Sequence, residues 1–232
     1  YVEAEFDPPT GFYTRVTQAA LDEALAAHPE VAAVVVPSPT YEGYISRLHC
    51  SVPLVVDAAH GAHFGLAPWL PGRMEGDAVI CSYHKTLPAL TQTAGVQVYD
   101  SSLAPKIKRY MDMYETSSPS YVLMNSVAKM ADLVANPAAF ETLQAGLQTL
   151  YKLPLQHLRL IRADDPTKIN IFTLHCNIDG NALAHRLRAR GIEPEMSDRI
   201  HVICMATVGD TVAGFHLLAR TLTEIDRTLS PG

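Results

Sequence analysis

Three short runs in the first half of the chain are apolar except at their ends, with no alternation between polar and apolar residues. They are VAAVVV (31–36), PLVVD (53–57) and DAVICS (77–82). A strand with one face in water alternates, so uninterrupted runs rich in valine and isoleucine indicate strands buried on both faces. Strands of this kind belong to parallel sheets that helices cover. The first half is therefore expected to form an α/β layer.

Two neighbouring segments complete this expectation. GVQVYD (95–100) is a fourth strand, and too few residues precede it for a covering helix, so an antiparallel partner is predicted there. Before the first strand, TQAALDEALAAHP (17–29) has apolar residues at helical spacing, with Thr17 as a plausible N-cap and Pro29 as a stop.

From Pro105 onward the pattern becomes helical and then mixed. Asn136 and Pro137 are typical of a helix start, and Gly191 is typical of a helix end. The chain is therefore expected to end in a small α+β domain. The expected helices are 105–116, 118–135, 136–153, 180–191 and 211–229, and the expected strands are 157–162, 169–176 and 199–207.

Composition restricts the partners. The 232 residues carry a formal net charge of −6, with 48% apolar and 18% charged residues. No basic field is available for nucleic acid or an anionic membrane, and no apolar stretch reaches the ~18 residues of a membrane span. The four cysteines are scattered in or beside apolar runs, which favours buried thiols in a reducing compartment. A cytoplasmic location without a signal peptide is therefore expected.

Polar side chains gather where two of the predicted strands end. Asp57 lies at the tip of one strand and His60 follows it, and Ser82, His84 and Lys85 lie at the tip of another. Ligands bind at the carboxyl ends of parallel strands. The alternative is structural, with the aspartate capping a turn and the lysine extending into solvent.

A carboxylate and a lysine in one buried cleft, with neither metal-ligand spacing nor a glycine-rich dinucleotide motif, suit pyridoxal 5′-phosphate (PLP). A lysine forms a Schiff base with this coenzyme, and a carboxylate keeps its pyridine nitrogen protonated. Desolvation lowers the pKa of such a lysine, so more of it is present as the neutral amine that can attack the coenzyme.

These residues lie in motifs that resemble the bacterial ornithine/lysine/arginine decarboxylase family, fold-type-I PLP enzymes related to aspartate aminotransferases. The resemblance spans nearly the whole chain. It implies an α/β fold with the mostly parallel sheet of a truncated large domain at 1–115, a helical connector at 116–150 and a small α+β domain at 151–232. The motifs are PSPTYEGY (37–44), LVVDAAHGAHFG (54–65), SYHKTLPALTQ (82–92), TSSPSY (116–121) and GIEPEMSD (191–198).

The resemblance also implies roles for single residues. Lys85 would form the Schiff base and Asp57 would pair with the pyridine nitrogen. Ala59 would lie against one face of the ring, and Ser82 would help to hold the phosphate. His60 would lie near the ring hydroxyl or the substrate.

Four further assignments are less specific. His84 would border the coenzyme and the substrate carboxylate. Ser38 and Thr40 fall where related folds approach the ring hydroxyl, although both suit a turn equally well. Glu195 could receive a substrate amine or be a solvated loop acid.

The implied reaction is decarboxylation of a basic amino acid in a homodimer or larger homo-oligomer, with TSSPSY at the subunit boundary. Arginine is favoured, and lysine and ornithine stay open; Lys85 or His84 would return the proton. An aminotransferase or related lyase would need an arginine clamp, for which Arg199 is the candidate. A non-catalytic truncated scaffold is the third alternative.

Two departures from the family pattern are expected to matter differently. Ala58 stands where the family usually has glutamate, and this side chain would point away from the ring. Relatives also have a long N-terminal part before the equivalent of Tyr1, with a phosphate-binding loop, and here PPTG (8–11) is better interpreted as a turn. A fragment with an uncovered sheet edge and apolar face is therefore expected.

No metal site is expected, because His63, His175 and His201 lack metal-ligand spacing with acids or cysteines. His201, inside a predicted strand, is interpreted as a packed core residue.

Overall fold

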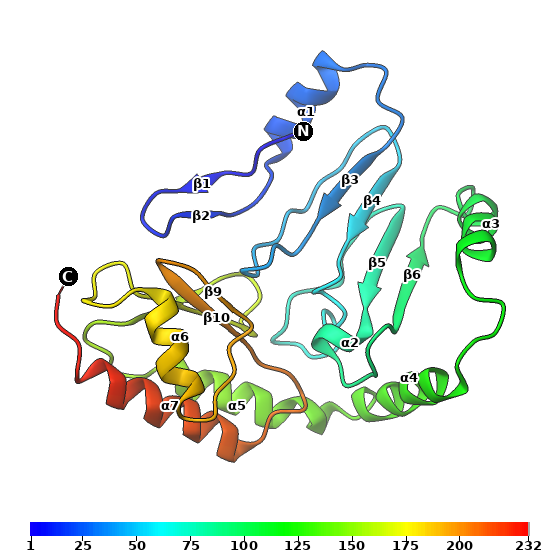
Figure 1. The fold of residues 1–232 in the computed structure, drawn as a ribbon. Coiled ribbons are helices and arrows are strands. Elements are labelled where there is room, and N and C mark those ends of the chain that lie inside the picture. Colours follow the sequence, from blue (N-terminus) through cyan, green and yellow to red (C-terminus); the bar gives the residue numbers. More distant parts are fainter. Residues whose placement is uncertain (232) are drawn as a thin grey trace. The chain divides into compact units, whose positions relative to one another are not determined.

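The computed structural model describes residues 1–231 (Figure 1). The chain forms two compact units. The first contains Tyr1–Phe6 and Tyr13–Ala135, and the second contains Asp7–Phe12 and the residues from Asn136 onward. The expected boundaries at 115 and 150 stay a prediction. The expected small domain ends with Gly232, which lies outside the described residues.

The first unit is built on a four-stranded sheet (Figure 1). Its spatial order follows the chain, with β3, β4 and β5 parallel and β6 antiparallel to β5. The predicted strands and the antiparallel fourth strand are confirmed. The bounds are β3 (Val34–Pro37), β4 (Leu54–Asp57), β5 (Ala78–Ser82) and β6 (Ala94–Val98).

Side-chain caps begin two of the helices of this unit. The hydroxyl of Thr17 accepts a hydrogen bond from the Ala20 N–H, and that of Ser120 accepts one from Leu123. The Thr17 cap is as predicted, and the helix after it ends before Pro29. The helices are α1 (Gln18–Ala27), α2 (Tyr83–Thr86), α3 (Ala104–Tyr114) and α4 (Tyr121–Val134).

Only one face of this sheet is buried. Val36, Val56 and Val79 pack in a cluster with residues of α1 and of the segments after β3 and β4. On the other face Val35 is 69% exposed and Ile80 is 39% exposed. The expectation that these strands are buried on both faces is therefore wrong for the described residues, because α1 and these loops all pack on one side. An exposed apolar face was expected from the family pattern.

The second unit is an antiparallel sheet with helices. Its central strand β8 is buried along its full length, including the fully buried Lys168. The predicted α+β organisation is present, with Asn136 capping the first turn by accepting from Ala138. The strand order is β7 (Arg159–Arg162), β8 (Lys168–Phe172), β10 (His201–Met205) and β9 (Met196–Ser197), and the helices are η1 (Pro137–Phe140), α5 (Glu141–Leu150), α6 (Gly180–Arg188) and α7 (Val212–Asp226).

A hairpin that the sequence pattern did not predict joins β1 (Phe6–Asp7) to β2 (Phe12–Tyr13). The intervening PPTG segment is a turn, as expected, and Gly11 has a φ of +71°. The ring of Phe12 packs edge-on against His201 at 4.6 Å. His201 is 3% exposed, so its prediction as a packed residue is confirmed.

Three of the four cysteines are buried, and Cys50 is half-buried, which corrects the expectation for that residue. Within residues 1–231 no helix is both long and apolar enough to cross a membrane.

The carboxylate of Asp226 ties the end of α7 to the segment that leads into β7. It accepts hydrogen bonds from the backbone N–H groups of Gln156, His157 and Leu158 at 2.7, 2.9 and 2.8 Å. Burial alone raises the pKa of a carboxyl group, but these three donors outweigh burial and lower the pKa of Asp226.

Replacing Asp226 with asparagine is expected to destabilise the chain by about 2–4 kcal/mol, because hydrogen bonds to an ionised group are lost. The native pKa lies below the ordinary value near 3.9, so the carboxylate stabilises the fold at neutral pH and this contribution is lost as the pH falls below about 4. Urea unfolding of both proteins from pH 7 to pH 3 measures this. The surface variant Asp112→Asn serves as control, and a stability gap that does not narrow in acid would contradict the assignment.

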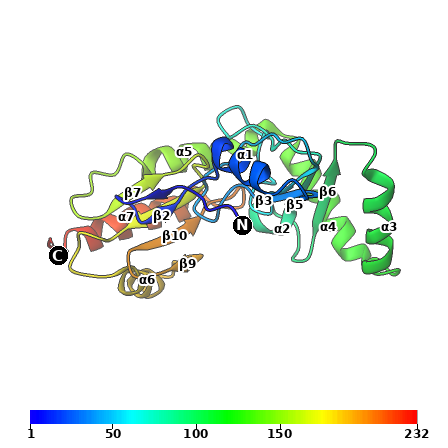
Figure 2. The same ribbon diagram turned by 90° about the horizontal axis from the view of Figure 1, so that it is seen from above.

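The helices α5 and α7 run side by side (Figures 1 and 2), and Gly146 of α5 lies at their contact. A Cβ there would overlap the ring of Phe215. A Cβ on Gly214, in α7, would meet the Thr211 hydroxyl oxygen at 3.6 Å, which is ordinary van der Waals contact. The two helical glycines therefore differ in the space around them.

Gly146→Ala is expected to destabilise the chain by about 1–3 kcal/mol through overpacking. Gly214→Ala is expected to stabilise it by up to about 1 kcal/mol, because alanine has the higher helix propensity. Thermal unfolding of the two variants measures the difference in sign, and equal effects would show that the α5–α7 contact does not limit residue size.

Candidate functional site

The site is built at the ends of two adjacent parallel strands. β4 and β5 pair in register, with Asp57 opposite Ile80. β4 ends at Asp57, whereas β5 continues to Ser82 and passes directly into α2, which carries Lys85. The sequence predicted Asp57 and Lys85 at the tips of these two strands. It did not predict the one-turn helix.

Lys85 lies beside His60. Its Nζ is 3.4 Å from the Nε2 of His60. The chain after β4 is directed toward β5 by a hydrogen bond from the Ala58 N–H to the Ile80 carbonyl, and it turns where the Gly61 N–H bonds to the Ala58 carbonyl. The amine and the imidazole, 25 residues apart in sequence, therefore meet at this edge of the sheet.

Asp57 forms a local turn. Its Oδ1 accepts a hydrogen bond from the Ala59 N–H at 3.1 Å. This oxygen therefore caps a turn, which was the structural alternative for Asp57. Within residues 1–231 its Oδ2 makes no hydrogen bond or ion pair. The carboxylate thus has an acceptor available for a ligand.

Burial of the candidate residues differs from the expectation. Asp57 and Lys85 are exposed, whereas Ala59, His60 and Ser82 are half-buried. The expected buried carboxylate and lysine are therefore wrong for the described residues. The reason is that Asp57 shares its sheet face with Ile80, and this is the face that α1 and the loops leave uncovered.

His84, on α2, is held by the turn before β6. Its Nδ1 lies 2.8 Å from the carbonyl oxygen of Thr93. Because a carbonyl only accepts, Nδ1 carries the proton in this contact, and the ring orientation is set by the backbone. His84 is half-buried.

The segment after β3 is pinned by its own hydroxyl groups. Buried Ser38 bonds to both the N–H and the carbonyl of Ser46. The Thr40 hydroxyl accepts from the Tyr44 N–H at 3.2 Å. Both side chains act as turn residues, which was the structural alternative. The ring of the next residue, Tyr41, packs edge-on against His60, a neighbour that sequence reasoning missed.

The remaining predicted residues belong to other segments of the chain. In TSSPSY, Ser120 caps α4 and the Thr116 hydroxyl accepts from the Ser118 N–H. Glu195 and Arg199 are exposed residues of the second unit. Within residues 1–231 no three histidine, cysteine, aspartate or glutamate side chains group as a metal site.

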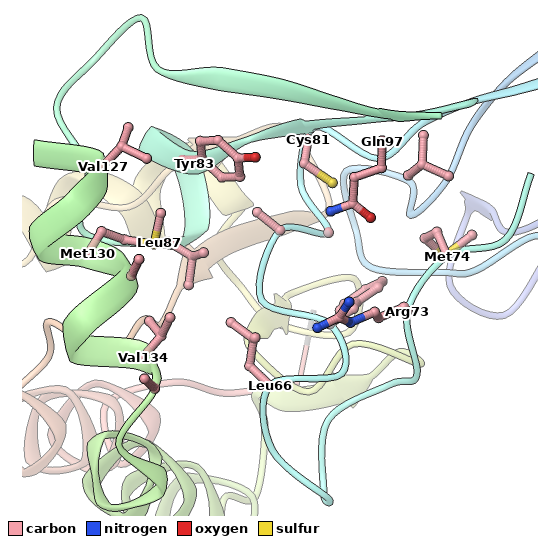
Figure 3. Close-up of a pocket in the computed structure, with 16 residues that line it drawn as sticks. Leu66, Arg73, Met74, Cys81, Tyr83, Leu87, Gln97, Val127, Met130 and Val134 are labelled. Carbon is pink, nitrogen blue, oxygen red and sulfur yellow. The ribbon is translucent and has the colours of Figure 1, made fainter. Parts of the chain in front are cut away.

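A cavity of about 420 Å³ lies on the opposite face of the sheet (Figure 3). Val127, Met130 and Val134 of α4 line one side, and Arg73, Cys81 and Gln97 line the other. Successive strand residues point to opposite faces, so Cys81 faces this cavity and Ser82 faces the side of Asp57. Burial raises the pKa of the Cys81 thiol, and the charge of Asp57 adds to this, so the thiol stays protonated.

Residues 1–169 match the family model described as "Orn/Lys/Arg decarboxylase, major domain". The chain belongs to this family. Arginine decarboxylase of Halalkalibacterium halodurans is 31% identical to it over 97% of the chain and 51% of the relative. Arginine decarboxylase of Bacillus subtilis is 28% identical over 99% of the chain and 52% of the relative.

Solved structures agree on the fold of this decarboxylase-family chain. Lysine decarboxylase A from Pseudomonas aeruginosa superposes with a TM-score of 0.75 at 18% identity, covering 98% of the chain and 42% of that structure. An alanine–glyoxylate aminotransferase from Nostoc reaches 0.65 at 16% identity, covering 91% and 66%. The predicted fold-type-I large-domain fold is confirmed, and the chain spans about half the length of the curated relatives it matches.

Proposed function

We propose that this chain carries the coenzyme-binding lysine of a PLP-dependent decarboxylase that acts on a basic amino acid, with arginine favoured over lysine and ornithine. The observation that supports this most directly is the 3.4 Å contact between Lys85 and His60 at the ends of β4 and β5, beside Asp57. The preference for arginine rests on the curated relatives, which are arginine decarboxylases.

The donor set fits the coenzyme. Asp57 has a carboxylate oxygen that makes no hydrogen bond within residues 1–231, and a carboxylate is the group that keeps a pyridine nitrogen protonated. Ala59, two residues after Asp57, has a small side chain, so a flat ring could approach the backbone there. The amine of Lys85 lies on the neighbouring segment and contacts His60.

When bound, PLP supplies an electron-accepting ring that stabilises the negative charge left on Cα as carbon dioxide departs. In this proposal Asp57 would stabilise the positive charge of the ring nitrogen, and Ser82 and Thr40 would offer hydroxyl groups to the phosphate and the ring hydroxyl. Lys85 would hold the coenzyme through its amine.

His84 is the residue best oriented to handle a proton. Its Nδ1–H is held by the Thr93 carbonyl, so in this neutral form Nε2 is an acceptor of fixed direction. In this role Nε2 would exchange a proton with the substrate, and Lys85 is the alternative donor to Cα. His60 would orient the lysine amine. We further propose that the active protein is a cytoplasmic homodimer or larger homo-oligomer.

Borohydride reduction of the chain mixed with PLP is expected to fix the pyridoxyl group on Lys85, as located by peptide mass spectrometry. Lys85→Ala should remove this labelling, whereas Lys129→Ala on α4 should not. Asp57→Asn should weaken coenzyme binding about 10- to 150-fold, because a charge-assisted hydrogen bond contributes about 1.5–3 kcal/mol. Coenzyme fixed equally on several lysines would contradict the proposed site and favour a scaffold.

The substrate is tested by release of carbon dioxide from arginine, lysine and ornithine, with glutamate as an acidic control. Arginine is expected to give the highest kcat/KM, and the amine and carbon dioxide should form in equal amounts. Formation of an oxo acid without carbon dioxide would instead establish an aminotransferase.

A further inference from the structure

We infer that Tyr41 is a positioning residue that holds the His60 imidazole against Lys85. The inference rests on the proposed role of Lys85 and extends the site to the segment after β3. Three segments that are separate in sequence thereby act together: Tyr41 after β3, His60 after β4 and Lys85 after β5.

The first step is the ring contact. The rings of Tyr41 and His60 lie 4.8 Å apart between centroids with an interplanar angle of 61°. Edge-to-face packing of this kind restricts rotation of both rings and contributes beyond simple burial. The orientation of the imidazole is therefore restricted by Tyr41.

The second step is the rigidity of the segment that presents Tyr41. Hydrogen bonds join the Thr40 N–H to the Tyr44 carbonyl at 2.8 Å and the Gly43 N–H to the Thr40 carbonyl at 3.1 Å. Gly43 has a φ of +99°, a conformation that favours glycine and closes the turn. Tyr41 thus projects from a closed turn and not from a loose loop.

The third step is a second contact between the same two segments. A Cβ on Gly61 would lie 3.1 Å from Cδ of Pro39, so the backbone after β4 packs closely on the proline before Tyr41. Tyr41 against His60 and Pro39 against Gly61 therefore form two adjacent contacts, which fix the separation of the two segments.

The last step is the effect on the lysine. An ammonium group donates but does not accept, so Lys85 is the donor and Nε2 of His60 is the acceptor in their contact. At 3.4 Å this hydrogen bond is long, and a rotation of the imidazole breaks it. Loss of the Tyr41 ring therefore releases Lys85 from His60.

The experiment is acetylation of the coenzyme-free chain at pH 8, with labelling of each lysine followed by mass spectrometry. Exposed Lys129 on α4 is the internal reference. Removing the acceptor frees the amine, so Tyr41→Ala and His60→Ala should each raise the labelling rate of Lys85 about threefold relative to Lys129. Tyr41→Phe keeps the aromatic edge and should retain the original rate.

A double-mutant cycle separates positioning from a general structural effect. If Tyr41 acts through His60, the variant with both alanines should label no faster than His60→Ala alone. Tyr110→Ala, which removes an exposed tyrosine of α3, should leave Lys85 unchanged. Additive effects in the double variant, or a wild-type rate in Tyr41→Ala, would overturn the inference.

Tyr41→Leu keeps most of the apolar volume, so it is the control for a loosening of the turn by loss of the side chain. It should behave like the alanine variant, because leucine lacks the ring that restricts His60, and restoration of the original rate by leucine would overturn the inference. The labelling uses no coenzyme. Failure of PLP to be fixed on Lys85 would therefore remove the proposed function while this cycle still decides the role of Tyr41.

Discussion

The parallel pairing of β4 with β5 is the constraint on which the rest of the candidate site depends. The ladder stops with Asp57 opposite Ile80, and from there both chains turn out of the sheet at the same edge. A shift of the register by one residue would send Asp57 to the opposite face, where the cavity beside α4 lies, because strand side chains alternate. The hydrogen bond from Ala58 to Ile80 extends the same pairing into the turn and brings His60 to Lys85.

Sequence patterns predicted the parts of this fold that are encoded locally. The apolar runs gave the three parallel strands, and Thr17 and Asn136 gave two helix starts, because caps and strand composition act within a few residues. The caps at Ser120, Asp179 and Thr211 have the same chemistry and could have been recognised in the same way. Helix α2 could not, because four residues without a side-chain cap are too short for a periodic pattern.

The contacts that distinguish the site are not local. His60 and Lys85 are 25 residues apart, and Tyr41 and His60 meet only because two turns pack on each other. The resemblance predicted which residue types belong at the site. It did not predict that His60 contacts the amine of Lys85, or that the Lys85 side chain is exposed. Val35 and Ile80 show why the prediction of burial was wrong. The apolar composition of a strand indicates that both of its faces can be buried, but the described residues pack against only one face of this sheet.

The carboxylate of Asp226 has a consequence for the order of assembly of the second unit. It lies 68 to 70 residues beyond the three backbone groups that it holds, and these groups stand directly before β7. Contacts of such long sequence separation form late, since the whole loop must close before they contribute. During synthesis on the ribosome, the β7 edge of this sheet therefore lacks these hydrogen bonds until α7 has emerged, and the nascent unit has no complete fold before that moment.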